Sequence, residues 1–243
     1  MAISPLRPED SGGRARRAHA VSSSADVSDL AREVSGLMTR EKFATEVMRT
    51  AIVTGRWRPG LRLAQDVIAE QLGISRMPVR SGLRQLESEG LVEFHPYRGA
   101  AVRLLSSREI AEIYELRILL ESRLLEAAVI HLSAERVDEL TTVALNIRLH
   151  SEGDDRWVDE RNIFYDDLYR LADLPRISRL VASLRREVGP YLALRPRTPH
   201  HTHIGVLEHL ATGDVVSAKS VLRAHLLRVS GELQGLVERL AES

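Results

Sequence analysis

The chain has 243 residues, of which 44% are hydrophobic, values that suit one large or two ordinary domains and exclude disorder throughout the chain. It has no cysteine, which excludes disulfide bonds, thiolate zinc sites and catalysis through sulfur, and suits a reducing compartment. Its 34 basic and 34 acidic residues cancel, so the net charge taken alone argues against nucleic acid as a partner.

The charges are nevertheless distributed unevenly. Between Arg40 and Arg103 basic residues outnumber acidic ones, and the rest of the chain balances the difference. A local positive face is therefore compatible with a neutral chain. No apolar run approaches the roughly 20 residues that span a bilayer, and the polar N-terminus lacks the apolar core of a signal peptide. We therefore expect a cytoplasmic protein with no membrane partner.

Residues 1–37 combine Ser, Gly, Pro, Arg and Asp without an apolar period. A segment of this composition buries too little surface to order itself, so we expect a flexible tail. Its arginines at positions 14, 16 and 17 could touch DNA phosphates, but a solvated tail is the favoured interpretation.

Residues 38–105 predict a small domain of three helices followed by a β-hairpin. Apolar residues recur at helical spacing from Phe43 up to Gly55, which predicts the first helix. A short second helix is stopped by Gly73, and Ser75 can cap the start of the third. Two extended runs, 91–94 and 100–104, then flank a turn-rich segment and predict the hairpin.

A short helix, a glycine-containing turn and a second helix with a polar start are the parts of a helix-turn-helix. The second helix enters the major groove with its N-terminus first, so we expect Arg76 and Arg80 to be the main contacts. Gly99, at the hairpin tip, would let the backbone of this wing approach the minor groove. The alternative is that both arginines are ordinary charges on a helix surface.

Residues 43–104 resemble the DNA-binding domain of the GntR family of bacterial regulators. The resemblance is carried, in order, by the turn TGRWRPGLRL, the helix start GISRMPVR and the run LESEGLV with the wing glycine. It implies DNA contacts from Arg76, Arg80 and Gly99, with Ser75 and Met77 flanking the base-reading positions. At one position the sequence departs from the family, because Asp66 replaces an arginine that usually contacts DNA. A carboxylate repels phosphate, so we expect weaker binding or a different operator.

After residue 105 the pattern predicts only helices. Ser106 and Glu109 predict a capping box at the start of the first one. Apolar residues then repeat at intervals of three and four, there and over about 134–149, 157–171, 177–194, 203–210 and 215–240. These six helices, without a convincing strand, predict a mainly α protein whose second domain, residues 106–243, is a helical bundle.

Residues 107–240 resemble, more loosely, the FadR-type branch of the same family, whose effector (FCD) domain is a helical bundle. The Leu116-Arg117…Glu121 pattern and the last helix carry this resemblance. The branch commonly holds a divalent metal, which receives the effector's carboxylate, with an aspartate and a histidine four residues apart plus two later histidines. The resemblance assigns the later two ligand positions to His203 and His225.

The first two ligands are replaced in this chain by Arg161 and Tyr165. A cation repels a metal ion, and neutral tyrosine is a poor ligand, so a metal is disfavoured and no cofactor is expected. Arg161 could instead bind the carboxylate of a small organic-acid effector directly, assisted by Tyr165, His203, His225 and Arg117. Alternatively, Arg161 pairs with an acid such as Asp167 or Glu121, and both histidines are hydrogen-bonded core residues.

The two domains together predict a sequence-specific transcriptional regulator, usually a repressor in this family, whose affinity for a palindromic operator depends on the effector. A homodimer is implied because two recognition helices must meet two half-sites about one helical turn apart. An enzyme is disfavoured, since the chain lacks motifs such as HExxH, a nucleophile elbow or a phosphate loop. A third possibility is a binding protein that has lost its DNA function, for which Asp66 is the only hint.

Overall fold

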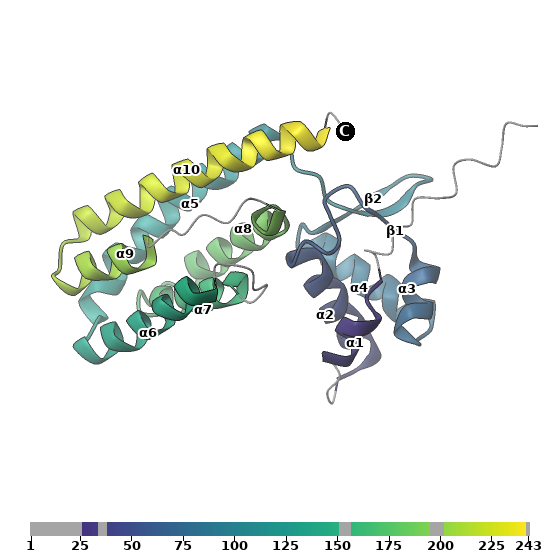
Figure 1. Ribbon diagram of the computed structural model, residues 1–243, viewed down its shortest axis with the longest axis horizontal. Coiled ribbons are helices and arrows are strands. Elements are labelled where there is room, and N and C mark those ends of the chain that lie inside the picture. The colour runs from purple at the N-terminus through teal and green to yellow at the C-terminus, as the bar shows by residue number, and fades with distance from the viewer. Residues whose placement is uncertain (1–25, 34–37, 151–156, 195–201, 242–243) are drawn as a thin grey trace, which may run out of the picture.

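Two domains follow one another along the chain in the computed structural model, which describes residues 26–33, 38–150, 157–194 and 202–241 (Figure 1). Each has its own hydrophobic core: the first core draws on residues between Val27 and Val102, the second on residues between Leu105 and Val237. The described residues are mainly helical, as the sequence predicts. No helix within these ranges is both long and apolar enough to cross a membrane.

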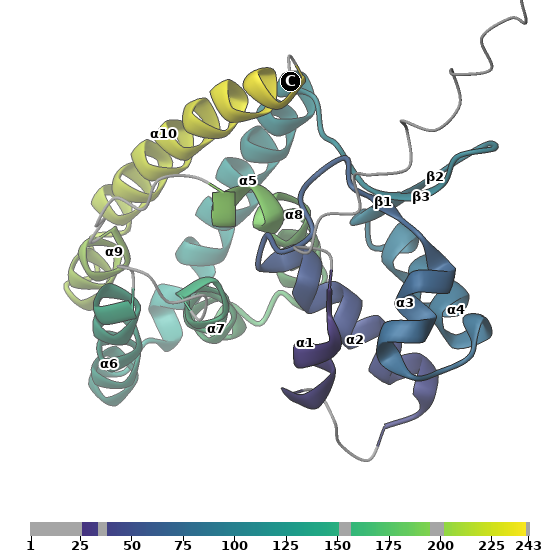
Figure 2. The same cartoon turned by 45° about the vertical axis from the view of Figure 1, so that its right-hand side comes forward.

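The first domain packs its helices against a small antiparallel sheet. The helices are α1 (Ser28–Glu33), α2 (Arg40–Val53), α3 (Gln65–Leu72) and α4 (Arg76–Ser88), and the strands are β1 (Arg62–Leu63), β2 (Val92–His95) and β3 (Gly99–Val102). The strand order is β1-β3-β2, and the β2–β3 hairpin extends away from the second domain (Figure 2). The three helices and the hairpin expected from the sequence are thus confirmed, whereas β1 was not expected.

Close packing between α2 and α4 fixes the orientation of α4. A Cβ atom at Gly82 would lie 2.7 Å from Met48 Cε and 2.8 Å from Thr45 Oγ1, so only glycine fits there. Val79 and Leu83 are fully buried on the same face of α4. The opposite face is therefore the one that α4 presents to solvent.

The expectation of a flexible tail over residues 1–37 is wrong for residues 26–33. These residues form α1 and the turn before it, with Val27 and Leu30 buried in the first core. Asp26 accepts hydrogen bonds from the Ser28 backbone and side chain, and Asp29 pairs with Arg56. The two buried apolar side chains and the ion pair with Arg56 hold this short helix against the first domain. The arginines at positions 14, 16 and 17 lie outside the described residues.

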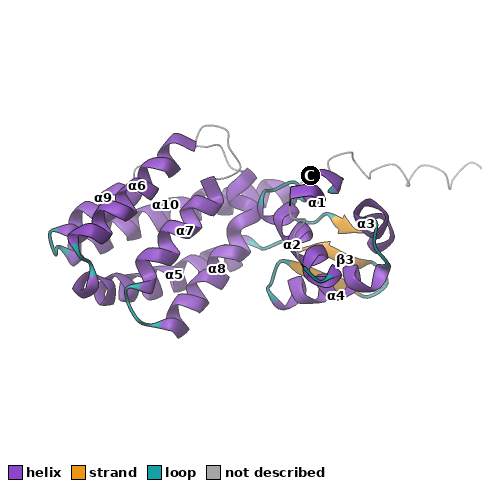
Figure 3. Ribbon diagram, turned by 90° about the horizontal axis from the view of Figure 1, so that it is seen from below, coloured by secondary structure: helices purple, strands orange, loops and turns teal. Residues whose placement is uncertain are grey.

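The second domain is a bundle of six α-helices among the residues described (Figure 3). They are α5 (Ser107–Ala128), α6 (Ala134–His150), α7 (Trp157–Arg170), α8 (Pro175–Leu194), α9 (Thr202–Ala211) and α10 (Val215–Ala241), with a 3₁₀ turn, Val129–His131, after α5. The predicted capping box is confirmed, since the Ser106 side chain accepts from Glu109 N–H and the Glu109 carboxylate accepts from Ser106 N–H. Long α10 lies along α5, and α9 packs between α10 and α6.

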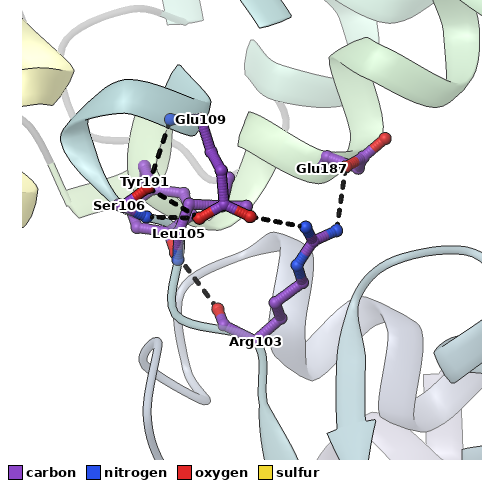
Figure 4. A network of polar contacts seen from close by, with 6 residues as sticks. All are labelled: Arg103, Leu105, Ser106, Glu109, Glu187 and Tyr191. Atoms are coloured by element: carbon purple, nitrogen blue, oxygen red, sulfur yellow. Dashed lines mark hydrogen bonds and ion pairs between the residues drawn. The ribbon is translucent and has the colours of Figure 1, made fainter. Parts of the chain in front are cut away.

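Polar contacts join the two domains at the segment between β3 and α5 (Figure 4). The Tyr191 hydroxyl of α8 accepts from Leu105 N–H at 2.6 Å and donates to the Arg103 carbonyl at 3.1 Å. The Arg103 guanidinium binds Glu109 at 2.8 Å and Glu187 at 3.2 Å. α8 therefore holds the connecting segment from one side, which restricts how the first domain can move relative to the bundle.

Candidate functional site

The N-terminal end of α4 is exposed, as a recognition helix requires. Ser75 occupies the N-cap position, although its side chain makes no capping hydrogen bond. Arg76 and Arg80 are exposed, and Met77 is 68% exposed despite its apolar side chain. The sequence analysis placed these four residues on one functional surface, and the structure brings them together at this end of the helix.

Asp66 lies beside this end of α4 and pairs with Arg76. The distance from Asp66 Oδ1 to Arg76 Nε is 2.5 Å, and the two side chains are 63% and 72% exposed. An ion pair this exposed contributes about 0–1 kcal/mol to folding. Its main effect is to place a negative charge next to one of the two arginines expected to bind DNA.

The first domain has further exposed arginines that the sequence analysis did not select. The arginines at positions 58, 62 and 98 are exposed, and neither they nor Arg80 form side-chain hydrogen bonds or ion pairs within the described parts of the chain. They lie in the turn after α2, in β1 and at the tip of the hairpin. Arginines without acidic partners are available to phosphate. The excess of basic residues between positions 40 and 103 was the signal that could have identified them.

The tip of the β2–β3 hairpin has an unusual backbone. Gly99 has φ +79°, and an added Cβ would meet no heavy atom within 4 Å, so glycine is needed there for conformation rather than for space. Tyr97 also has a positive φ, 65°, which is uncommon for a side chain of this size, and it is fully exposed. The tip therefore presents glycine backbone and an aromatic ring to whatever approaches it.

In the second domain, unusually many charged and polar side chains are buried in the core. The described residues concerned are Arg117, Glu121, Arg161, Arg185, His203 and Ser230. Charged groups are almost never fully buried unless they are paired or functional. This cluster is therefore the candidate binding site of the bundle.

The residues predicted to bind the effector meet inside this cluster. His203 Nδ1 lies 3.2 Å from the Tyr165 hydroxyl, and the rings of His203 and His225 are 6.3 Å apart. His225 Nδ1 accepts from Arg228 Nη2 at 3.0 Å. Arg161 is 4% exposed and contacts Asn162 Oδ1 at 3.2 Å. The sequence thus located the inward faces of α7, α9 and α10 correctly.

The two acids considered as partners of Arg161 each pair with another arginine. Glu121 binds Arg117 at 2.7 Å and accepts from the Tyr169 hydroxyl at 2.5 Å, deep in the core. Asp167 pairs with Arg170 on the exposed side of α7. Arg117, which the sequence analysis also assigned to the effector, is thus held by a carboxylate of its own helix.

Burial and positive neighbours keep the imidazoles neutral. Burial, reinforced by Arg161, lowers the pKa of His203 to about 3. Burial, followed by the charges of His203 and Arg228, also lowers the pKa of His225 well below its usual value. Burial raises the pKa of the Tyr165 hydroxyl to about 12. At neutral pH these three groups are uncharged hydrogen-bonding partners.

This set of side chains does not fit a divalent metal. Arg161 is close enough to act on the charge of His203, and Tyr165 keeps its proton. Within the described ranges no three His, Asp or Glu side chains converge on one point. Two imidazoles beside a guanidinium lack the carboxylate that would compensate the charge of a metal ion.

Arg185 is the buried charge that the sequence analysis missed. It lies on α8, pairs with Asp166 and stands over the rings of Tyr165 and Tyr169, with its Cζ 5.5 Å and 5.8 Å from their centroids. Helical spacing could have found it, because position 185 falls on the buried stripe of Val181 and Val188.

Two family models match the chain one after the other. Residues 41–102 match the bacterial regulatory proteins of the gntR family, and residues 112–228 match the FCD domain. An HTH-type transcriptional regulator of Agrobacterium vitis is 36% identical over 109 residues, 45% of this chain and 64% of that protein. The gluconate operon transcriptional repressor of Bacillus subtilis is 28% identical over 152 residues, 62% of each protein. These two matches span less than two thirds of either relative.

Solved structures of similar proteins have the same fold over most of the chain. McbR/YncC of E. coli superposes with a TM-score of 0.71 at 22% identity, over 82% of this chain and 99% of that one. A putative GntR regulator from Rhodococcus sp. RHA1 superposes with a TM-score of 0.69 at 25% identity and the same coverage. The chain therefore belongs to the GntR family of bacterial regulatory proteins, a family of DNA-binding transcriptional regulators rather than enzymes, and carries an FCD domain as its second half.

Proposed function

We propose that this protein is a cytoplasmic transcriptional repressor that binds a palindromic operator as a homodimer and responds to a small carboxylate bound in its FCD domain. The DNA contacts are Ser75, Arg76, Met77, Arg80 and Gly99. The exposed start of α4, together with arginines of the same domain that have no acidic partner among the described residues, supports this half of the proposal. Repression is supported by the name of the Bacillus subtilis relative, a repressor.

The imbalance of buried charge carries the carboxylate half of the proposal. Three guanidinium groups, Arg117, Arg161 and Arg185, are buried among the described residues, whereas Glu121 is the one buried carboxylate there and Asp166, which pairs with Arg185, is half-exposed. Buried positive charge is costly unless an anion compensates it. Burial, followed by the other two arginines, lowers the pKa of Arg161 to about 10, which still leaves it charged at neutral pH. Arg161 therefore binds the carboxylate, and Tyr165, His203 and His225 orient it.

The proposed site binds a carboxylate without a resident metal, because Arg161 supplies the positive charge that a metal would supply. Metal analysis of the purified protein tests this point, and a stoichiometric divalent metal would contradict it.

A gel-shift titration against the intergenic DNA upstream of the protein's own gene tests the regulator. We expect a sequence-specific shift that weakens as salt increases. Arg80→Ala should abolish the shift without lowering the unfolding temperature. Arg108→Ala is the matched control, since its side chain is 89% exposed at the start of α5, outside the DNA-binding domain, and it should bind as wild type does. Equal loss of binding in both variants would contradict the role of Arg80.

A thermal-shift series with gluconate, citrate, succinate and benzoate, each beside its neutral amide, tests the effector class. A carboxylate that binds the folded state raises the unfolding temperature, whereas its amide should not. Arg161→Gln should remove the response. If no carboxylate stabilises the wild-type protein, the carboxylate half of the proposal is wrong.

A further inference from the structure

Arg185 lies in the middle of α8 with only part of its hydrogen-bonding capacity used. Its side chain is 3% exposed, and Nη2 pairs with Asp166. Nε and Nη1 are inaccessible to solvent and have no hydrogen-bond partner in the part of the chain that the structure describes. Buried donors are nearly always satisfied in folded proteins, and an unmade bond costs more at a charged group than at a neutral one.

The surroundings of the guanidinium do not provide the missing acceptors. Its Cζ stands over the rings of Tyr165 and Tyr169, which are stacked with their centroids 5.5 Å apart. Ring faces attract the cation but do not accept its in-plane N–H groups. The Tyr169 hydroxyl donates to Glu121 and the Tyr165 hydroxyl lies 3.2 Å from His203, and neither oxygen accepts a hydrogen bond from Arg185 Nε or Nη1. Arg185 therefore shares Tyr165 with the proposed effector site, yet two of its nitrogens remain unsatisfied.

We infer that Arg185 is an effector-binding residue whose Nη1 donates to the anionic group of the ligand while Asp166 holds Nη2. This inference rests on the proposed carboxylate effector and adds a residue from α8 to those from α7, α9 and α10. Asp166 is 50% exposed and competes with the ligand for the same guanidinium. The pair thus positions Arg185 and limits how strongly it binds an anion.

The two members of this ion pair should have opposite effects on carboxylate binding. Arg185→Met, combined with Asp166→Asn to avoid leaving a lone carboxylate, should weaken binding of the responsive carboxylate by roughly tenfold or more, because a charge-assisted bond is lost. Asp166→Asn alone should tighten it several-fold, since a competing negative charge is removed. Asp167→Asn is the control for net charge and should bind as wild type does, because Asp167 is one residue away and, within the described ranges, pairs with exposed Arg170 alone.

Binding constants from thermal-shift titrations with gluconate, citrate, succinate and benzoate, together with unfolding temperatures without ligand, decide between a binding and a structural role. We expect the double variant to be about as stable as wild type, because an apolar side chain of similar length replaces a half-satisfied charge. A clearly lower unfolding temperature with an unchanged carboxylate response would make Arg185 structural and overturn the inference. Loss of binding in Asp166→Asn would also overturn it. If the wild-type protein responds to none of the four anions, the proposed function and this inference fail together.

Discussion

Among single residues, Asp66 has the clearest consequence for DNA binding. It lies at the start of α3 and pairs with Arg76, the first residue of the recognition helix. Both side chains are exposed, so the pair adds little to stability. Phosphate groups must instead compete with this carboxylate for Arg76, which reduces the electrostatic part of DNA affinity.

Asp66→Arg should tighten operator binding. The substitution removes a repulsive charge, releases Arg76 and adds one cation near the phosphates. A protomer that gains one phosphate contact should steepen the dependence of log affinity on log salt by about 0.9. Gel-shift titrations at several salt concentrations measure this slope. Glu70→Arg is the matched control, because Glu70 is exposed one turn along the same helix and forms no ion pair with Arg76 among the described residues. Weaker binding by Asp66→Arg would mean that the aspartate itself contacts the operator.

The lowered pKa of His203 predicts that the protein loses stability in mild acid. Its pKa is about 3 in the folded protein, lowered by burial and then by Arg161, against about 6.5 when unfolded. Below pH 6.5 the unfolded state binds a proton that the folded state does not, so the free energy of unfolding decreases as the pH is lowered. Between about pH 6.5 and 5 the loss from His203 is about 1.5 kcal/mol, and His225 adds to it. The free energy of unfolding, measured by urea denaturation between pH 6.5 and 5, should fall less steeply in His203→Asn than in the wild-type protein. An unchanged dependence on pH would mean that a different group titrates.

The sequence locates the candidate site only in part, and the missing parts have physical reasons. Tyr165 and His203 could be placed on inward helix faces because apolar neighbours recur at helical spacing around them. Arg185 was overlooked because α8 also contains exposed arginines, although its spacing from Val181 and Val188 sets it apart from them. The pairing of Asp66 with Arg76 joins two helices, so no local pattern could predict it.

At the scale of secondary-structure elements, α8 connects the two proposed binding sites. Arg185 faces the buried cluster, whereas Glu187 and Tyr191, within the next two turns, hold the segment that leads to the DNA-binding domain. Six residues of helix span about 9 Å, so Arg185 and Tyr191 lie close together on one helix, although Pro190 between them removes one of its backbone hydrogen bonds. α8 is therefore the element through which effector binding would change the position of the DNA-binding domain.

The substitution Gly55→Ala tests the contact between the last turn of α8 and the DNA-binding domain. It has φ +75°, and an added Cβ would lie 3.0 Å from Ala193 Cβ and 3.6 Å from Leu194 Cδ2. Gly73 has φ +64° and nothing within 4 Å of an added Cβ, so it provides a matched control. Both alanine variants should lose about 1–2 kcal/mol of unfolding free energy through backbone strain. Gly55→Ala should lose about 1–3 kcal/mol more, because α8 has to move. If urea denaturation shows equal losses of unfolding free energy in both variants, α8 can shift away from the added methyl group at little cost.

Elements differ in how well the sequence predicts them. The capping box of α5 and the glycines around α3 and α4 are local signals, and the helices that they bound are confirmed. α1 and β1 are too short to show a period, and both depend on contacts distant in sequence. Val27 is buried in the first core, and Arg62 pairs with Ala101. Tertiary packing decides such segments, so their sequences look like loops.

For the whole molecule, the proposed dimer makes DNA affinity depend on the distance between half-sites. Each protomer carries one recognition helix, in a domain whose arginines at positions 58, 62, 80 and 98 have no acidic partner among the described residues, so each protomer would cover one half-site. The contacts of Arg103 and Tyr191 hold the DNA-binding domain against the bundle, which fixes the separation of the two recognition helices once the bundles associate. Such a dimer has little freedom to follow a change in the operator.

Inserting about five base pairs between the half-sites should reduce affinity to that of a single half-site, because half a helical turn places the second half-site on the opposite face of the duplex. Inserting about ten restores the face but moves the half-site by about 34 Å, further than a dimer held at Tyr191 can follow, so affinity should stay low. Gel-shift titrations on the three operators measure both effects. A monomeric binder would be indifferent to either insertion. Recovery with the longer one would show that the two domains are flexibly linked, and would contradict the role given to α8 and Tyr191.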